Sequence, residues 1–307
     1  MCSVLVGAAL VCDVAHAAPA IETPPAEPST ERDVEPDRRL ASAAITAGAY
    51  SLLFGWVTLA WYVRAEDAPQ FQVHDEGWFG ADTYAGGADK LGHFWGNYAM
   101  TRGVSQTLQW GGWKRGWSIA AAGGLSLAFF TFSEIKDGYK VAYGFSYGDM
   151  IANTLGAGLG VAFELSPALD RRFDVRLSYL PSASYIDRLS EDGPFNTPED
   201  YTGQTFFVDY HLGSIDAVRR HAPWARYLDL SVGYRAVNYK PMPMNGEDRR
   251  QELFVGASLN VQAVLAHLSK HGVVNFIGEM YQVPYTTLPL AGVERQGGNT
   301  ASMNTGQ

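Results

Sequence analysis

The chain has 307 residues, which is long enough for two domains or one large one. Only 18% of its residues are charged, whereas a typical soluble domain has about 25%; 47% are hydrophobic and 33 are glycine. Such a composition is typical of a chain that is partly solvated by lipid. The net charge of -9 and the lack of a basic stripe in the sequence argue against binding to nucleic acid, because phosphate contacts need clustered Lys and Arg.

The first residues of the chain resemble a secretory signal peptide. Residues 3–11 are apolar, and the small residues at positions 15 and 17 fit a cleavage site. We therefore expect residues 1–17 to direct export and to be removed. Cys12 raises the alternative of a lipid-modified N-terminus. Because Cys2 and Cys12 are the two cysteines of the chain, a mature chain without this segment has no disulfide, thiol nucleophile or cysteine-based metal site.

A polar linker and a long apolar segment follow. Residues 18–39 are rich in Pro, Glu and Asp and cannot build a core, so we expect a disordered tether. Residues 41–63 contain no formal charge, and a bilayer span needs about 20 such residues. Aromatic residues gather toward one end of this segment, as they do at membrane interfaces. We therefore predict a membrane-spanning helix, with a buried helix of a globular protein as the alternative.

Three more helices are predicted from apolar periodicity and composition, at residues 90–109, 117–135 and 148–165. Together with the first helix they would form a membrane-associated domain of about four helices over residues 40–166. Gly156 and Gly160 are four positions apart in the last of them, and such pairs of small residues let two helix backbones approach closely.

The basic residues around these helices bear on the topology. In a four-helix arrangement they would all lie at one end: Arg38, Arg39, Lys114, Arg115, Arg171 and Arg172. The positive-inside rule would make that end cytoplasmic, whereas a cleaved signal peptide would place the N-terminus outside the cytoplasm. The sequence therefore predicts a membrane-associated, periplasm-facing protein of the cell envelope, and does not decide between the inner and the outer membrane.

Ionisable residues concentrate in three short stretches beside these helices. In the first, Asp89 and His93 are four positions apart and share one helix face, with Lys90 next to them. In the second, Glu134 and Asp137 are three positions apart at the end of the third predicted helix. The members of each pair therefore point to a common side of their helix.

The third stretch begins the fourth predicted helix. Ser146 is placed to cap that helix, and Asp149 occupies the third position of its first turn. Asn153 lies four residues further on and shares the face of Asp149. Ionisable groups beside long apolar helices are costly and usually paired. We therefore expect the three stretches to converge on one site.

Two functions fit this set of residues, and a purely structural network is the alternative. Carboxylates and imidazole suit hard or borderline divalent metals, and the candidate ligands are Asp89, His93, Glu134, Asp137 and Asp149. Water activated by such a metal could attack a phosphoester or an amide, with His93, Glu134 and Asp149 as candidate catalytic residues. Alternatively, Lys90 and His93 receive a lipid phosphate. The full set of candidate binding residues is Asp89, Lys90, His93, Glu134, Asp137, Ser146, Asp149 and Asn153.

The order of these motifs is similar to that of the YfiM-like predicted lipoproteins of the bacterial envelope. The resemblance covers about residues 85–165 and rests on Asp89-Lys90-x-x-His93-Phe94, Glu134-x-x-Asp137 and Gly144-Phe145-Ser146-x-x-Asp149-x-x-x-Asn153-x-x-Gly156. VanZ-like membrane proteins show a more distantly similar order. The first resemblance implies an envelope location and no particular activity. The second implies, through a link to glycopeptide tolerance, an envelope glycolipid as the partner.

After Pro167 the apolar residues recur at every second position, which is typical of half-buried strands. We predict a β-rich domain over residues 167–285 and a flexible tail at residues 286–307. Strands are expected at residues 173–180, 204–213, 228–236, 252–259 and 273–281, and a short helix at residues 261–270. A membrane barrel needs about eight strands or more. A small antiparallel sheet packed on the helical half therefore fits better, with an oligomeric or incomplete barrel as the alternative, and the predicted fold class is α+β.

The sequence favours a non-enzymatic envelope protein that binds or organises a membrane lipid, an envelope glycolipid or a cell-wall precursor through the polar residues. A metal-dependent hydrolase of such a lipid and a structural module are the alternatives, so enzymatic activity and the identity of any cofactor stay open. Four histidines of the second half are interpreted as ordinary surface or core residues, because they lack the clustering of a metal site: His211, His221, His267 and His271.

Overall fold

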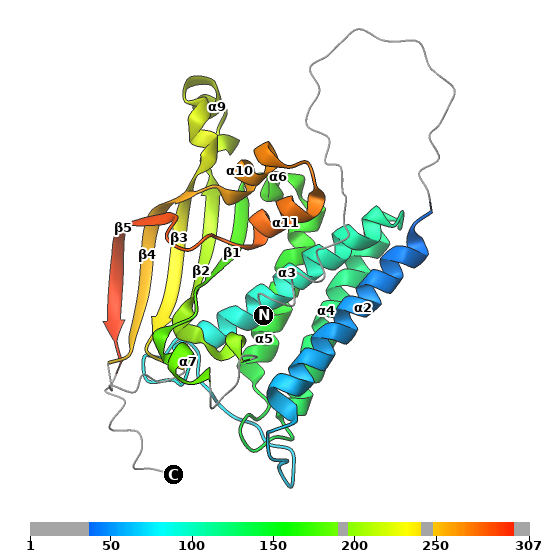
Figure 1. Cartoon of the computed structure of the whole chain (residues 1–307), viewed down its shortest axis with the longest axis vertical. Helices are drawn as coiled ribbons and strands as arrows, with labels where there is room; N and C mark the ends of the chain where they lie inside the picture. Colours follow the sequence, from blue (N-terminus) through cyan, green and yellow to red (C-terminus); the bar gives the residue numbers. More distant parts are fainter. Residues whose placement is uncertain (1–36, 190–195, 241–247, 298–307) are drawn as a thin grey trace.

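Four long helices form one side of the molecule in a computed structural model that describes residues 37–189, 196–240 and 248–297. The expected signal peptide and most of the expected tether lie outside these residues. The helices run alternately in opposite directions along the bundle (Figure 1). Their bounds are α2 (Arg39–Val57), continued by the π-helical turn η1 (Thr58–Tyr62), α3 (Ala88–Trp110), α4 (Arg115–Asp137) and α5 (Tyr147–Leu165). The four predicted helices are thereby confirmed to within a few residues at each end.

Helices α3 and α5 pack closely because α5 presents glycine to its neighbour. A Cβ atom at Gly156 would lie 2.0 Å from the carbonyl oxygen of Phe94, and one at Gly160 would lie 2.8 Å from Cβ of Thr101. No larger residue fits at Gly156 without moving the two backbones apart. The close approach that the spacing of these glycines predicts is therefore present, and it brings the first turns of α3 and α5 together.

A five-stranded antiparallel sheet forms the other side of the molecule (Figure 1). Its strands follow one another in chain order, each paired with the next: β1 (Phe173–Tyr179), β2 (Gln204–His211), β3 (Leu228–Val237), β4 (Arg250–Leu259) and β5 (Thr287–Gln296). The short helix α6 (Pro167–Asp170) precedes β1. Further short helices lie between the strands: α7 (Ala183–Asp187), α9 (Asp216–His221), α10 (Val261–Leu268) and α11 (Gly272–Met280), with 3-10 turns η2 (Thr197–Glu199), η3 (Tyr201–Gly203), η4 (Leu212–Ser214) and η5 (Pro223–Tyr227). The predicted α+β class is confirmed.

The last part of the chain differs from the prediction in two places. Residues 273–281, predicted as a strand, belong mostly to helix α11, because the apolar residues Val273, Phe276 and Met280 recur at helical spacing rather than at every second position. Residues 287–296, expected in the flexible tail, form β5. This edge strand is exposed on both faces. Its sequence therefore does not need to alternate between apolar and polar residues, and that alternation is the pattern by which a strand is recognised.

One hydrophobic core joins the helices to the sheet. Trp95 of α3 is fully buried, and its ring centroid lies 5.2 Å from that of Tyr281, which follows α11. Val175 and Leu177 of β1 belong to the same buried cluster. The sheet therefore packs on the helical half, and this packing places the loops at one end of the sheet beside the N-terminus of α3.

Candidate functional site

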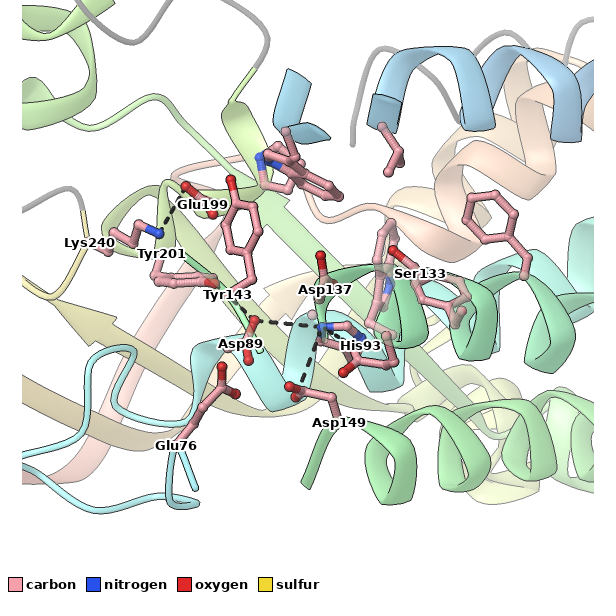
Figure 2. A pocket seen from close by; sticks show the side chains of 18 of the residues that line it. Glu76, Asp89, His93, Ser133, Asp137, Tyr143, Asp149, Glu199, Tyr201 and Lys240 are labelled. Atoms are coloured by element: carbon pink, nitrogen blue, oxygen red, sulfur yellow. Dashed lines mark hydrogen bonds and ion pairs between the residues drawn. The ribbon is translucent and has the colours of Figure 1, made fainter. Parts of the chain in front are cut away.

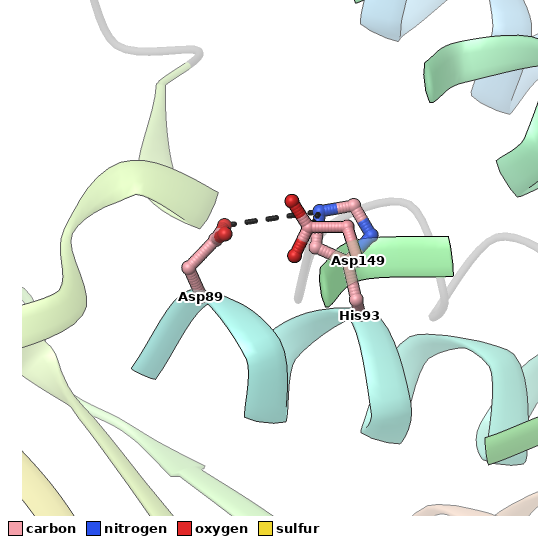
Figure 3. A group of neighbouring side chains, drawn as sticks. All are labelled: Asp89, His93 and Asp149. Atoms are coloured by element: carbon pink, nitrogen blue, oxygen red, sulfur yellow. Dashed lines mark ion pairs between the residues drawn. The ribbon is translucent and has the colours of Figure 1, made fainter. Parts of the chain in front are cut away.

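The three polar stretches meet where three helix ends converge. Asp89 and His93 stand on the first two turns of α3, Glu134 on the last turn of α4, and Asp149 on the first turn of α5. The Asp149 amide N–H donates to the hydroxyl oxygen of Ser146 at 3.3 Å, so Ser146 caps α5 as its position predicts. The side chains of Asp89, His93 and Asp149 point toward one another in Figure 3.

His93 lies at the centre of the cluster. Its Nε2 atom is 3.7 Å from Oδ1 of Asp89, 3.6 Å from Oε1 of Glu134 and 3.9 Å from Oδ1 of Asp149. These separations exceed hydrogen-bond length. A four-coordinate ion with bonds of about 2.1 Å holds its ligands about 3.4 Å apart. One ligand atom from each of Asp89, His93 and Asp149 lies within 4.8 Å of the others. A small inward movement of these three side chains would bring the ligand atoms to the separation that a divalent cation requires.

The tautomer of His93 follows from its neighbours. The Asn97 amide donates from Nδ2 to Oδ1 of Asn153 at 2.6 Å and to the backbone oxygen of His93 at 3.1 Å, while Ser126 donates to Oδ1 of Asn97 at 3.1 Å. Because Oδ1 of Asn153 is thus an acceptor, the contact of 3.1 Å from Nδ1 of His93 is a donated hydrogen bond. When the ring is neutral, the lone pair of Nε2 therefore points toward the three carboxylates, which is the arrangement of a metal-ligating histidine.

Lys90 neutralises carboxylates inside the protein. Its Nζ atom lies 2.6 Å from Oε2 of Glu76, 3.0 Å from Oδ2 of Asp89 and 2.8 Å from Oδ1 of Asp149, and the side chain is almost fully buried. An ammonium group has three N–H donors, and those of Lys90 donate to Glu76, Asp89 and, at 3.4 Å, the hydroxyl oxygen of Ser146. The residue is thus placed to bind the carboxylates of the cluster rather than an external anion.

The charges of the cluster depend on one another. Burial alone would raise the pKa of Asp89, but the positive charges of His93 and Lys90 hold it well below its usual range. Burial opposes the charged form of His93, yet Asp149, Asp89 and Glu134 raise its pKa to about 9. Burial and the charge of Asp89 raise the pKa of Asp149 to about 9. At neutral pH the cluster therefore carries protons that a divalent cation would have to displace.

Asp137, a further predicted ligand, lines the same cavity without joining the group of ligand atoms around His93. Its backbone oxygen accepts hydrogen bonds from the amides of Lys140 and Gly144, each at 2.9 Å. These bonds shape the turn that leads into α5. In the described structure, the backbone of Asp137 therefore helps to shape the site. This role cannot be predicted from the spacing between Asp137 and Glu134.

A cavity of about 400 Å³ opens from the cluster, as Figure 2 shows. At one end it is polar, since Asp89, His93, Glu134 and Asp149 line it. Its apolar walls come from α2 and η1 and from α4, with the residues Leu53, Trp56, Val57, Trp61, Phe129 and Phe130. A compartment of this kind suits a ligand that has a charged head and a hydrocarbon part.

Residues far from the three stretches complete the site. The Tyr201 hydroxyl, on η3, donates to Oδ1 of Asp89 at 2.9 Å. Lys240, just after β3, lies 3.0 Å from Oε2 of Glu199, and both line the cavity. Glu76 reaches the cluster from the loop between η1 and α3. Sequence reasoning missed all four, because single Tyr, Lys and Glu residues in loops carry no motif.

A second ionic cluster lies on one face of the sheet. Arg176 is fully buried and contacts Asp174, Asp209 at 3.1 Å and Asp229 at 2.7 Å. His211 adds contacts of 2.8 Å to Oδ1 of Asp229 and 3.3 Å to Oδ2 of Asp174. His211, interpreted from sequence as an ordinary residue, is therefore a buried member of the ion network that joins β1, β2 and β3.

Two helices of the described structure are long and apolar enough to cross a membrane, namely Arg39–Tyr62 and Arg115–Asp137. They lie side by side, with ring centroids 5.7 Å apart both for Tyr50 and Phe129 and for Phe54 and Phe132. Only 17% of the apolar window in the first is buried. By length and composition both helices are candidates for a membrane span, and the first has most of its apolar window at the surface of the described structure.

Comparison with known proteins bears on the helical part. Residues 75–165 match a family described as "Predicted periplasmic lipoprotein (DUF2279)". The matched segment runs from the loop of Glu76 through α5 and contains all three polar stretches. No curated protein and no solved structure matches the chain. The match agrees with the predicted resemblance to periplasmic lipoproteins and with the predicted location in the cell envelope, facing the periplasm. It does not extend to the YfiM-like or VanZ-like relationships in particular.

Proposed function

We propose that this protein binds an amphiphilic lipid or lipid-linked precursor of the cell envelope and holds the anionic head through a divalent cation on Asp89, His93 and Asp149. The observation that carries the proposal is the cavity, because it joins these three residues to apolar walls from α2 and α4. A metal site alone would not need the apolar walls, and an acyl pocket alone would not need buried ionisable groups.

The charge balance favours a cation at the head of the cavity. Four carboxylates gather here against two basic groups, namely Glu76, Asp89, Glu134 and Asp149 against Lys90 and His93. With Lys90 already bound to carboxylates, a phosphate that entered the cavity would face mainly carboxyl groups and no free ammonium group of the described residues. A divalent cation changes the sign of that surface and can bridge carboxylates to phosphate oxygens.

The other walls define the rest of the ligand. Leu53, Val57 and Phe130 form an apolar surface that fits a hydrocarbon chain. Tyr143, Tyr201 and other polar groups near the cluster supply hydroxyls for a polar head. Because α2 and α4 also have the length and composition of membrane helices, a lipid could enter the cavity from the bilayer without crossing water.

A second candidate function is metal-dependent hydrolysis of such a lipid, which the position of Glu134 favours. Oε1 of Glu134 lies 3.6 Å from Nε2 of His93, beside the three candidate ligands. A carboxylate next to a metal-bound water can act as a general base. In this alternative the same site would cleave a phosphoester or an amide of the lipid that it binds.

The experiment measures metal and lipid in the same preparations. The full chain is purified in detergent without chelator, and elemental analysis is combined with mass spectrometry of extracted lipids. Wild type should carry one divalent cation per chain and a co-purifying lipid, and His93→Ala should lose both. His221→Ala, which removes an exposed histidine of α9, is the matched control and should lose neither.

The outcomes separate the alternatives. Wild type that takes up none of Mg²⁺, Ca²⁺, Mn²⁺ or Zn²⁺ on dialysis would contradict the proposal and favour a structural cluster. Loss of metal without loss of lipid would contradict the bridging cation. For the second candidate, the metal-loaded protein is incubated with the lipid found, and release of its head group in wild type but not in Glu134→Gln would establish hydrolysis.

A further inference from the structure

A second groove lies between the first halves of α2 and α4. Figure 1 shows that both helices begin at the end of the bundle opposite to the N-terminus of α3. The volume of the groove is about 820 Å³. The walls are apolar, and Ala43 and Tyr50 of α2, Leu108 of α3, and Trp117 and Leu125 of α4 line it. Trp117 is 72% exposed. The groove therefore leaves a large apolar surface open along two helices that have the composition of membrane helices.

Basic side chains stand at the rim of this groove. Arg39 and Lys114 line it. Arg39 donates from Nε and Nη2 to the backbone oxygen of Gly112 at 3.3 and 3.4 Å, and its Nε atom lies 4.0 Å from Oδ1 of the exposed Asp37. A guanidinium group has five N–H donors, so others are available to a ligand. Lys114 is exposed, and its ammonium group has no ion-pair partner among residues 37–189, 196–240 and 248–297. The rim is thus suited to an anion.

The start of α4 adds to the positive potential at the rim. Helices α2 and α4 both begin there, and neither has an acidic residue in its first turn. The amide of Arg39, the first residue of α2, donates to Oδ1 of Asp37 at 3.1 Å, whereas no side chain of the described residues caps α4. The N-terminus of a helix carries partial positive charge and free N–H groups. Arg38 and Arg115, which flank the rim residues, belong to the same end of the bundle.

One polar group inside the groove lacks a partner. Thr46 lines the groove, is only 7% exposed, and its hydroxyl has no hydrogen bond within the described part of the chain. Thr46 stands about two turns below Arg39 on α2. In a phospholipid the phosphate is followed by glycerol and ester oxygens and then by hydrocarbon. The groove presents a basic rim, an unpaired hydroxyl and apolar walls, which are the groups that would contact these three parts of the ligand.

We propose that this groove binds an anionic phospholipid of the bilayer, with the phosphate at Arg39 and Lys114 and an acyl chain along Trp117 and Leu125. The site is separate from the His93 cavity and does not depend on the function proposed for it. Charge complementarity at the rim selects an anionic over a zwitterionic head, and the apolar walls select a lipid over a soluble phosphate. The lipid would fix the basic end of the bundle at the surface of an anionic leaflet.

The test compares matched variants in detergent with added lipid. Full-length wild type should bind phosphatidylglycerol about 30-fold more tightly than phosphatidylcholine by native mass spectrometry, because two basic residues near a lipid phosphate contribute on this order. Arg39→Gln/Lys114→Gln should reduce the preference to near one. Arg220→Gln/Lys270→Gln removes the same charge at exposed positions outside the groove and should keep the preference.

Each alternative outcome counts against the proposal. Equal losses in both double variants would indicate non-specific attraction, and equal binding of inorganic phosphate would indicate a soluble ligand. If Arg39→Gln disturbs folding through its bond to Gly112, Lys114→Gln alone tests the same prediction, with circular dichroism as the check on folding. The metal content of the rim variants should equal that of wild type, so failure of this site and failure of the proposed function can be told apart.

Discussion

Tyr201 and Asp89 are 112 positions apart in the chain, and the phenol hydroxyl of Tyr201 donates to Oδ1 of Asp89 at 2.9 Å. Tyr201 is buried and stands on the turn η3 just before β2, whereas Asp89 begins α3. Through this bond the sheet half of the molecule orients a candidate metal ligand that the helical half supplies. The oxygen that accepts this bond is also the one that faces His93.

Removing that hydroxyl should weaken cation binding without unfolding the protein. Tyr201→Phe keeps the ring and removes the donor, and loss of a group that orients a metal ligand costs about 10- to 100-fold in affinity. Calorimetric titration with Zn²⁺ or Mn²⁺ measures the effect. Tyr285→Phe, at a residue that is 90% exposed, is the control. Unchanged affinity in Tyr201→Phe would mean that Asp89 is not a ligand or does not need this bond.

Asn153 should act as a positioning residue for His93. Asn153→Ala removes the acceptor that holds the proton on Nδ1, so the ring can turn or adopt the other tautomer, and cation affinity should fall by about 10- to 100-fold. Asn153→Asp keeps an acceptor and should retain more of the affinity. Both variants are titrated with the same cation, and equal losses in the two would argue against an orienting role.

Cation binding should depend steeply on pH. The pKa of His93 in the cation-free protein is raised to about 9 by the neighbouring carboxylates, so a bound cation must displace its proton. Below pH 9 the apparent affinity should therefore fall by at least about tenfold for each pH unit, and proton release should be detected by titration in buffers of different ionisation enthalpy. Affinity that is constant between pH 6 and 8 would exclude His93 as a ligand.

Gly156 should be required for the packing of α5 on α3. In Gly156→Ala the new methyl group would meet the carbonyl oxygen of Phe94 at 2.0 Å, and overpacking of this kind costs about 1–3 kcal/mol. Gly158→Ala, two residues away with no atom within 4 Å of its Cβ position, should be neutral or gain up to about 1 kcal/mol from helix propensity. Denaturant unfolding compares the two variants, and equal stabilities would contradict the close approach.

The ion network of the sheet should make stability decline at alkaline pH. Burial opposes the charged form of His211, but hydrogen bonds to Asp174 and Asp229 raise its pKa to about 10, from about 6.5 in an unfolded chain. Because the pKa of His211 is higher in the folded state, its protonation stabilises the folded protein fully when the pH is below the pKa of the unfolded chain. This contribution is lost as pH rises from about 6.5 through 10. Unfolding of wild type and His211→Gln at pH 6, 8 and 10 should give curves that converge as pH rises.

The sequence alone was sufficient for the features that depend on local patterns. Uncharged apolar length predicts α2, helical spacing places Asp89 beside His93, and Ser146 three residues before Asp149 predicts the cap of α5. Each of these depends on residues within a few positions, where backbone geometry alone fixes which side chains share a face. The convergence of the three stretches followed from the cost of unpaired charge beside apolar helices.

Tertiary structure decided what local spacing cannot express. Helix α11 and strand β5 were not predicted, because their short apolar patterns are ambiguous until burial is known. Tyr201 and Lys240 reach the site through contacts that arise only when the sheet half packs on α3, and Glu76 reaches it from the irregular loop before α3. The direction of the flexible Lys90 side chain was likewise not predictable. Neighbours from other elements determine whether it points to a ligand or to the carboxylates of the cluster.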